Sequence, residues 1–170
     1  RQVVVAYEGD AGTKSFVFKL RMSAVSGLPA TFTWSAIGGS GLDSAKVAED
    51  FLDVATPTIT IPAGSDSAEL VVSVRGDTKH ERDETFLVVA VPRDGMSGSP
   101  DTASGLIRND DSMPSVRILD AADVVEPAVH GDVADATFRI VLSAKTGVPV
   151  AVTWGTEDSS ARQGLDYTSS

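Results

Sequence analysis

The strongest constraint on the fold of this chain is an alternation of apolar and polar residues with a period of two. In the run Phe16–Met22, every second residue is apolar, and Lys19 and Arg21 occupy positions between them. An extended strand turns successive side chains to opposite faces. The run therefore predicts a strand with one buried face.

Similar short runs recur along the first two thirds of the chain, separated by stretches rich in Gly, Pro, Ser and Asp. They cover residues 3–7, 32–36, 59–61, 70–74, 86–91 and 103–107. Seven short strands with turns between them predict an all-β fold, an antiparallel immunoglobulin-like β-sandwich. Helical periodicity is limited to a short turn of helix expected around Ala45–Phe51.

One segment of the chain occurs twice. The sequence FKLRMSAVSGLPATFTW, which ends at Trp34, reappears as FRIVLSAKTGVPVAVTW, which ends 120 positions later at Trp154. Glu8 and Glu126 are 118 positions apart, and Asp50 and Asp166 are 116 apart. Loops therefore change length between matched strands, as expected of an internal repeat.

The repeat divides the chain into two parts, with a boundary at Asp111–Pro114. Residues 1–111 are predicted to form one complete module, and residues 112–170 the N-terminal half of a second. Both tryptophans, Trp34 and Trp154, are expected to anchor a core. A half-sandwich leaves its apolar face at Phe138, Ile140 and Leu142 without a cover, so we expect this part to be incompletely ordered or completed by another chain.

The charge and cysteine content exclude several classes of function. With 14 basic and 24 acidic residues, the net charge is −10, which opposes binding to nucleic acid or to anionic lipid. The chain has no Cys, which excludes disulfides, thiolate metal sites and a Cys nucleophile. No apolar run is long enough to span a bilayer, so direct membrane insertion is not expected.

The acidic residues gather where predicted strands end. They include Glu8, Asp50, the acidic loop Asp77–Glu84 and the terminal run Asn109–Asp111. Loops at one end of a sandwich lie close together, so the last three groups are expected to converge on one pole. Clustered carboxylates repel one another unless a cation offsets their charge. Ca²⁺ is the expected ion, because it takes six to eight oxygen ligands and needs neither His nor Cys.

The order of these motifs resembles the Calx-beta family, which occurs in sodium/calcium exchangers, integrin beta-4 and large bacterial surface proteins. The resemblance rests on EGDAGTKSFVFKL, the strand ending at Trp34, Glu49-Asp50-Phe51, ITIPAGSDSAELVVSVRGDTKHERDETF and GLIRNDD. It covers the first module and the N-terminal half of the second. The most specific elements are the PAG turn, the acidic loop before the ETF strand, and the closing NDD.

The resemblance implies a set of calcium ligands. In the first module it points to Glu8, Asp50, Asp77, Glu81, Glu84, Asp110 and Asp111, with the main-chain carbonyl of Lys79 as a further ligand. In the second part it points to Glu126 and Asp166. Gly76 and Asn109 stand where the richest family sites carry acids, which predicts one to three Ca²⁺ ions.

Other readings of single motifs are weaker. Arg75-Gly76-Asp77 spells an integrin-recognition tripeptide, but Arg75 closes a strand. His80 lacks the further His that a transition-metal site needs, and is expected to face solvent. No serine satisfies the nucleophile motif Gly-x-Ser-x-Gly, so the chain is not expected to be an enzyme.

Two functions fit these features. The first is a Ca²⁺-stiffened structural and adhesion spacer in a large modular surface or secreted protein, located outside the cell or on its surface. The second is a regulatory calcium sensor of an exchanger-like transporter, in the cytoplasm. Expected partners are calcium ions, neighbouring modules of the same chain and another protein or cell surface.

Overall fold

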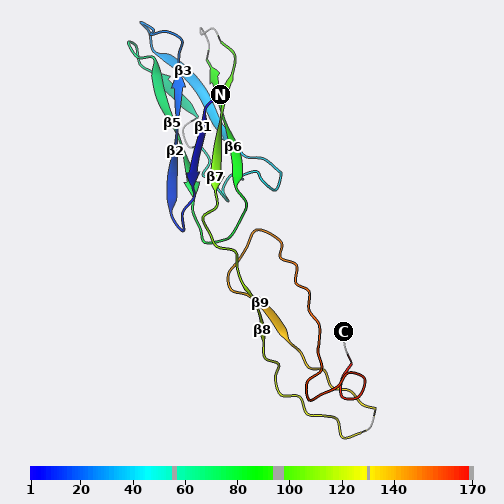
Figure 1. Ribbon diagram of the computed structural model, residues 1–170. Coiled ribbons are helices and arrows are strands. Elements are labelled where there is room, and N and C mark those ends of the chain that lie inside the picture. The colour runs from blue at the N-terminus through cyan, green and yellow to red at the C-terminus, as the bar shows by residue number, and fades with distance from the viewer. Residues whose placement is uncertain (55–56, 94–97, 130, 169–170) are drawn as a thin grey trace.

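A computed structural model describes residues 1–54, 57–93, 98–129 and 131–168 of the chain, and its regular elements are all strands (Figure 1). The first seven strands are those predicted from alternation. They are β1 Val3–Tyr7, β2 Thr13–Arg21, β3 Ala30–Ile37, β4 Thr58–Ile61, β5 Ser67–Arg75, β6 Glu84–Pro92 and β7 Asp101–Arg108. Strands β8 Val116–Leu119 and β9 Arg139–Leu142 follow in the second part. No described residue belongs to a helix long and apolar enough to cross a membrane.

The first seven strands form two sheets that face each other, which confirms the predicted β-sandwich. One sheet has the order β1-β7-β6-β3-β4, and the other consists of β2 and β5. All pairs are antiparallel except β1 with β7, which run parallel from Val3 beside Ser104 to Tyr7 beside Arg108. This parallel pair departs from the antiparallel expectation and brings the ends of β1 and β7 to the same edge.

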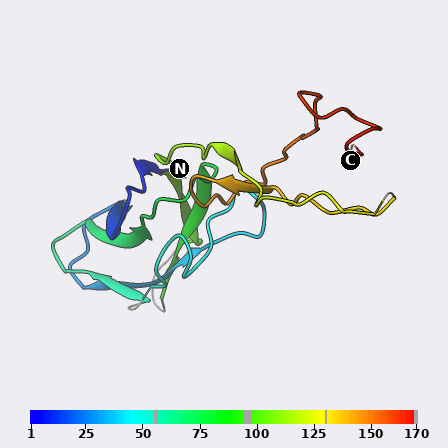
Figure 2. The ribbon, with the colours of Figure 1, turned by 90° about the horizontal axis from the view of Figure 1, so that it is seen from below.

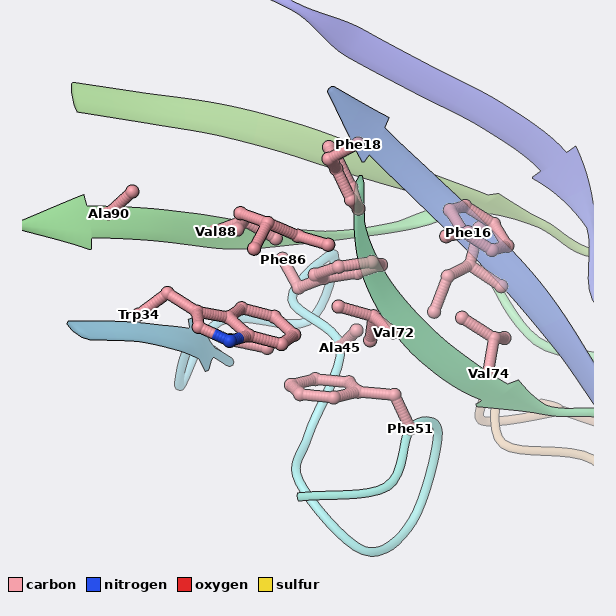
Figure 3. Close-up of a cluster of buried hydrophobic side chains, with 13 residues drawn as sticks. Phe16, Phe18, Trp34, Ala45, Phe51, Val72, Val74, Phe86, Val88 and Ala90 are labelled. Carbon is pink, nitrogen blue, oxygen red and sulfur yellow. The ribbon is translucent and has the colours of Figure 1, made fainter. Parts of the chain in front are cut away.

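Phenylalanines from both sheets and from a loop fill the core of the sandwich. The ring of Phe86 lies 5.6 Å from Phe16, 6.0 Å from Phe18 and 4.9 Å from Phe51 between centroids (Figure 3). Trp34 is buried beside them, as predicted. Truncating a buried Phe to Ala costs about 3–5 kcal/mol, so each ring of this cluster contributes substantially to the stability of the first module.

The expected turn of helix around Ala45–Phe51 is absent, and the segment forms turns instead. Asp50 donates its N–H to Lys46 O over 3.0 Å, which closes a single turn. The helix does not continue because Phe51 enters the core and pairs with Val74 of β5. Core packing thus outweighs local helix propensity, and it fixes Asp50 beside β5.

The second part of the chain has little core of its own. Strands β8 and β9 pair antiparallel, and no further strand is described after β9, although a third was predicted before Trp154. Trp154 is 56% exposed, against 8% for Trp34, so its predicted role as a core anchor is wrong. The described part of the chain contains no second sheet that covers it (Figures 1 and 2).

The apolar face of β9 is also open, as the sequence predicts for a half-module. Phe138 is 59% exposed, Ile140 40% and Leu142 38%.

Candidate metal centre

The acidic pole of the first module is built on the parallel pair β1 and β7. Glu8, which follows β1, donates its N–H to Arg108 O at the end of β7 over 3.1 Å. One residue later, Gly9 donates its N–H to Asp110 Oδ1 over 3.0 Å. The start of the linker and the residues after β1 are therefore held together.

The acidic loop Asp77–Glu84 connects β5 to β6 and closes over the same edge. Glu81 donates its N–H to Asn109 Oδ1 over 2.9 Å, and Asn109 donates its own N–H to Asp83 Oδ1 over 3.1 Å. Asn109 Nδ2 donates to Asp111 O over 2.9 Å. Asn109 thus ties the acidic loop to the linker, a role that needs both the donor and the acceptor of an amide.

Glu8 is the buried acid of the pole. Its side chain is only 7% exposed. Burial is the main cause that raises its pKa to about 8, and the charges of Asp77, Glu81, Asp111 and Asp110 raise it further. Five carboxyl groups from β1, the acidic loop and the linker therefore act on one another.

A second pair of acids lies beside this group. Burial raises the pKa of Glu84 to about 8, followed by a hydrogen bond with Asp50 and by the charges of Asp50 and Glu81. Asp50 reaches this place because its carbonyl accepts the Arg75 N–H over 2.8 Å, while its Oδ2 accepts the Lys46 N–H over 2.6 Å. Glu81 acts on both Glu8 and Glu84, so it links the two groups.

Asp111 has a carboxylate oxygen that nothing satisfies. Its Oδ2 is buried and has no hydrogen-bond partner among the described residues. Burial raises the pKa of this group, and the charges of Asp10, Asp110 and Asp77 raise it further. A buried oxygen without a donor is costly unless a cation or another partner reaches it.

Lys79 supplies a cation near these acids. Its Nζ donates to Glu81 Oε1, and this contact is the main cause that raises the pKa of Lys79. Asp77 Oδ1 accepts the Lys79 N–H over 2.7 Å, which holds the loop in a tight turn. The ammonium therefore offsets Glu81, whereas the charge of His80 acts on Asp111 and lowers its pKa against the effect of burial and of the neighbouring acids.

The described residues contain no group of three or more acidic, His or Cys side chains already spaced as metal ligands. The carboxylates converge, but several are turned to other partners. Asp110 holds Gly9, Asp77 holds Lys79 and Glu81 is paired with the Lys79 ammonium. The donor set of hard oxygens, with the orphaned Asp111 Oδ2, nevertheless fits Ca²⁺ chemistry.

The structure brings together the first-module residues named from the sequence and leaves the two others apart. Glu126 is exposed and lies outside the pole. Asp166 is also exposed, and its Oδ2 accepts the Arg162 N–H over 2.9 Å. Sequence reasoning missed Asp10, although the string Glu8-Gly9-Asp10 places a second acid directly after β1.

Gly76 explains one departure from the richest family sites. A Cβ at this position would lie 2.0 Å from Gly9 O and 2.8 Å from Glu8 O. These are main-chain atoms that cannot move without disturbing the β1 end. A side chain at position 76 is therefore excluded for a steric reason, and no further acid joins the pole there.

The structure also bears on the weaker motif readings. Arg75 is the last residue of β5, as predicted, and Gly76 packs against the main chain after β1. This tripeptide is not a projecting loop tip. His80, expected to face solvent, is half-buried, and its Nδ1 donates to Asp111 O over 2.8 Å.

Comparisons with known proteins place this architecture. No protein-family model matches the sequence, and no curated protein matches it. Among solved structures, CBD12 from CALX1.2 and the calcium binding domain CBD12 of CALX1.1 have TM-scores of 0.55 and 0.54, each at 20% identity and over 65% of this chain. The chain spans 43% and 42% of those two structures.

The apo-form Calx CBD1 domain gives a further match, with a TM-score of 0.52 and 21% identity. It covers 64% of this chain and 91% of that domain. At these identities the likeness establishes the fold. The predicted resemblance to Calx-beta domains is therefore confirmed as a shared β-sandwich architecture.

Proposed function

We propose, for a chain with the fold of Calx CBD1, that its first module binds Ca²⁺ at the acidic pole. The ligands would come from Glu8, Asp77, Glu81, Asp110 and Asp111, with Asp50, Glu84 and the Lys79 carbonyl in support. The observation that carries this proposal is the burial of Glu8 among other acids. Glu8 is only 7% exposed, and the charges of four other carboxyl groups raise its pKa.

The chemistry of the pole favours a hard divalent cation. The side-chain atoms that could bind a metal are carboxylate oxygens. Nδ1 of the nearby His80 is already hydrogen-bonded to Asp111 O. Calcium accepts many oxygen ligands in irregular geometry, which suits a loop and a linker whose carboxylates still have freedom to turn. Bound Ca²⁺ supplies positive charge that lowers the pKa values of Glu8 and Glu84.

At the level of the whole protein, we propose a structural spacer in a large surface or secreted protein. Asp110 and Asp111 belong both to the acidic pole and to the linker that leads to the second part. An ion held there would fix the start of the linker against the acidic loop. Calcium would thus stiffen the path from one module to the next.

A regulatory calcium sensor is the second candidate. The observation that favours it is the similarity to solved calcium-binding domains of Calx. In that case the same stiffening would transmit a signal rather than bear a load. Sequence flanking this chain discriminates the two, because transmembrane helices beside the array favour the sensor and many further modules favour the spacer.

Thermal melting tests the calcium proposal. The parent chain and an Asp77→Ala, Asp111→Ala double variant are melted in millimolar Ca²⁺ and in chelator. An ion that binds only the folded state adds about 2.7 kcal/mol at a hundredfold excess over Kd. The parent is expected to melt at a higher temperature with Ca²⁺, whereas the double variant loses that shift.

Two outcomes count against the proposal in different ways. Identical melting of the parent in both conditions would mean that these acids are surface charge only. A full calcium shift in the double variant would mean that the ion binds elsewhere. A variant at Asp66 serves as the control and keeps the parent shift, because Asp66 precedes β5 at the end opposite the acidic loop.

A further inference from the structure

A turn in the second part of the chain docks on the acidic loop of the first. Gly147 donates its N–H to His80 O over 2.9 Å, and Thr146 Oγ1 donates to the same oxygen over 3.0 Å. His80 and Thr146 also form a parallel bridge. The acceptor is a main-chain carbonyl, so this contact depends on the path of the loop rather than on a particular side chain.

Close packing explains why a glycine stands at this turn. A Cβ on Gly147 would lie 2.4 Å from Glu81 Oε1 and 3.0 Å from Lys79 Cε. Its φ is not in the left-handed region, so the backbone conformation alone does not demand glycine. The space beyond the Gly147 Cα is filled by the Glu81 and Lys79 side chains of the first module, which a larger residue would have to displace.

The first module carries the counterpart of this turn at Ser26-Gly27, 120 positions earlier. The two turns share a local hydrogen bond. Ser26 Oγ accepts the Leu28 N–H over 3.1 Å, and Thr146 Oγ1 accepts the Val148 N–H over 3.0 Å. The same side-chain acceptor therefore shapes both turns.

Within the described part of the chain, the first-module turn is held by its own module, since Ser26 O accepts the Gly64 N–H over 2.8 Å, but the Gly27 position itself is open. Nothing lies within 4 Å of a Cβ built on Gly27, and its φ is not left-handed. Nor does the Gly27 N–H have an acceptor among the described residues. Leu28 is 75% exposed, whereas its counterpart Val148 is half-buried at the junction.

No contact with the described residues of its own module therefore explains why residue 27 is a glycine. Its counterpart, Gly147, packs against an acidic loop. We propose that the turn Val25–Pro29 is a docking site for the loop equivalent to Lys79–Glu81 of another module of this kind. The inference rests on the modular part of the proposed spacer function and names its module-to-module contact; it does not require calcium.

The docking would repeat one geometry along an array. Each module would present an acidic loop at one pole and a glycine turn at the other. The Gly27 N–H and Ser26 hydroxyl would donate to the carbonyl that corresponds to His80 O. Leu28 and Val25, which is 62% exposed, would then be partly covered.

Disulfide capture between two copies of this 170-residue chain tests this docking, because the chain has no cysteine of its own. The donor chain carries Glu81→Cys together with Gly147→Pro, which removes the N–H that holds its own turn on His80 O. The receiver carries Gly27→Cys. We expect the mixed disulfide dimer to form several-fold faster than with a Gly155→Cys receiver, since Gly155 also has nothing within 4 Å.

The positive control is a single chain with Glu81→Cys and Gly147→Cys, which is expected to close an internal disulfide. Gly147→Leu replaces Gly147→Pro if the latter donor does not melt as a folded protein. Equal capture rates for the Gly27→Cys and Gly155→Cys receivers overturn the inference. Capture is measured in chelator, so its failure stays distinct from the absence of a calcium shift.

Discussion

Glu8 and Glu84 hold their protons to about pH 8 in the folded, calcium-free protein. In the unfolded chain the pKa of each group returns to its ordinary value of 4.5. Between these two values the folded state binds more protons than the unfolded state, so stability falls as pH rises. We expect the melting temperature in chelator to be higher at pH 5.5 than at pH 8.

A Glu8→Gln variant checks the origin of this pH dependence. The amide keeps the shape of the protonated acid and cannot ionise, so its melting temperature should change less between the two pH values than that of the parent. Glu69→Gln, an exposed change on β5, is the control and keeps the parent slope. A Glu8→Gln slope as steep as the parent slope would contradict the assignment.

The Lys79 ammonium competes with any ion for Glu81, because it already pairs with that carboxylate. Replacing it in Lys79→Gln leaves Glu81 unpaired among other acids. We expect a lower melting temperature in chelator and tighter Ca²⁺ binding by calorimetry, by a few-fold.

The matched control is Lys46→Gln, which removes an exposed lysine paired with Glu49 over 3.0 Å. Exposed pairs contribute little, so this variant should change neither quantity by much. If Lys79→Gln binds Ca²⁺ with the parent affinity, the Lys79 ammonium does not compete with the ion for Glu81.

At the scale of elements, alternation located every strand of the first module. It did so because each strand buries one face, and the core residues Phe16, Phe18 and Phe86 all stand on such faces. The parallel pairing of β1 with β7 was not predictable in this way. Alternation records which face is buried, whereas the direction of a partner about 100 residues away leaves no local trace.

The same local signal failed at Trp154. Its surroundings match those of Trp34, but burial needs a second sheet, and the described second part offers only β8 and β9. A sequence pattern predicts which side chain would be buried in a complete module. It does not show whether the strands that would bury it are present.

The long loop before β4 contains a strained residue that a substitution can relieve. Ala48 has a φ of 71°, and its N–H donates to Phe51 O over 2.8 Å. The counterpart Gly164 has a φ of 79° and donates to Tyr167 O over 2.8 Å. A left-handed Ala costs about 1–2 kcal/mol, and Gly costs about 0.5–1 kcal/mol of chain entropy.

We therefore expect Ala48→Gly to raise the free energy of unfolding by about 0.5–1 kcal/mol, measured by urea denaturation. Ala24→Gly, an exposed change outside the left-handed region, should lower it slightly or leave it unchanged. A loss of stability in Ala48→Gly equal to that in Ala24→Gly would contradict the strain argument.

At the scale of the whole molecule, part of the acidic pole was predictable because its acidic residues follow strands that end together. The strand count placed Asp50, the acidic loop and the terminal run Asn109–Asp111 at one pole. Glu8 was named only through the family resemblance, and it reaches the pole through the parallel pairing of β1 with β7. That Asn109 connects the acidic loop to the linker was not predictable, since this role depends on its hydrogen bonds to Glu81 and Asp111. Docking of Gly147 on the acidic loop likewise left no sequence signal beyond the repeated glycine.

The contact at Gly147 controls how firmly the second part is held to the first. Gly147→Pro removes the N–H that donates to His80 O and adds ring atoms beside Glu81. We expect small-angle scattering to show a larger maximum dimension and a broader distance distribution. Melting of the first module should change little, because its core lies away from this turn.

Gly155→Pro is the control, since no atom lies within 4 Å of its Cβ position. The linker residues Asp110 and Asp111 also belong to the proposed calcium site, so Ca²⁺ should narrow the parent distribution. In Gly147→Pro, calcium would still order the linker but could not restore the lost contact with His80. Scattering curves that coincide for the parent and Gly147→Pro would mean that the turn does not hold the junction, and that the linker alone sets the distance between the two parts.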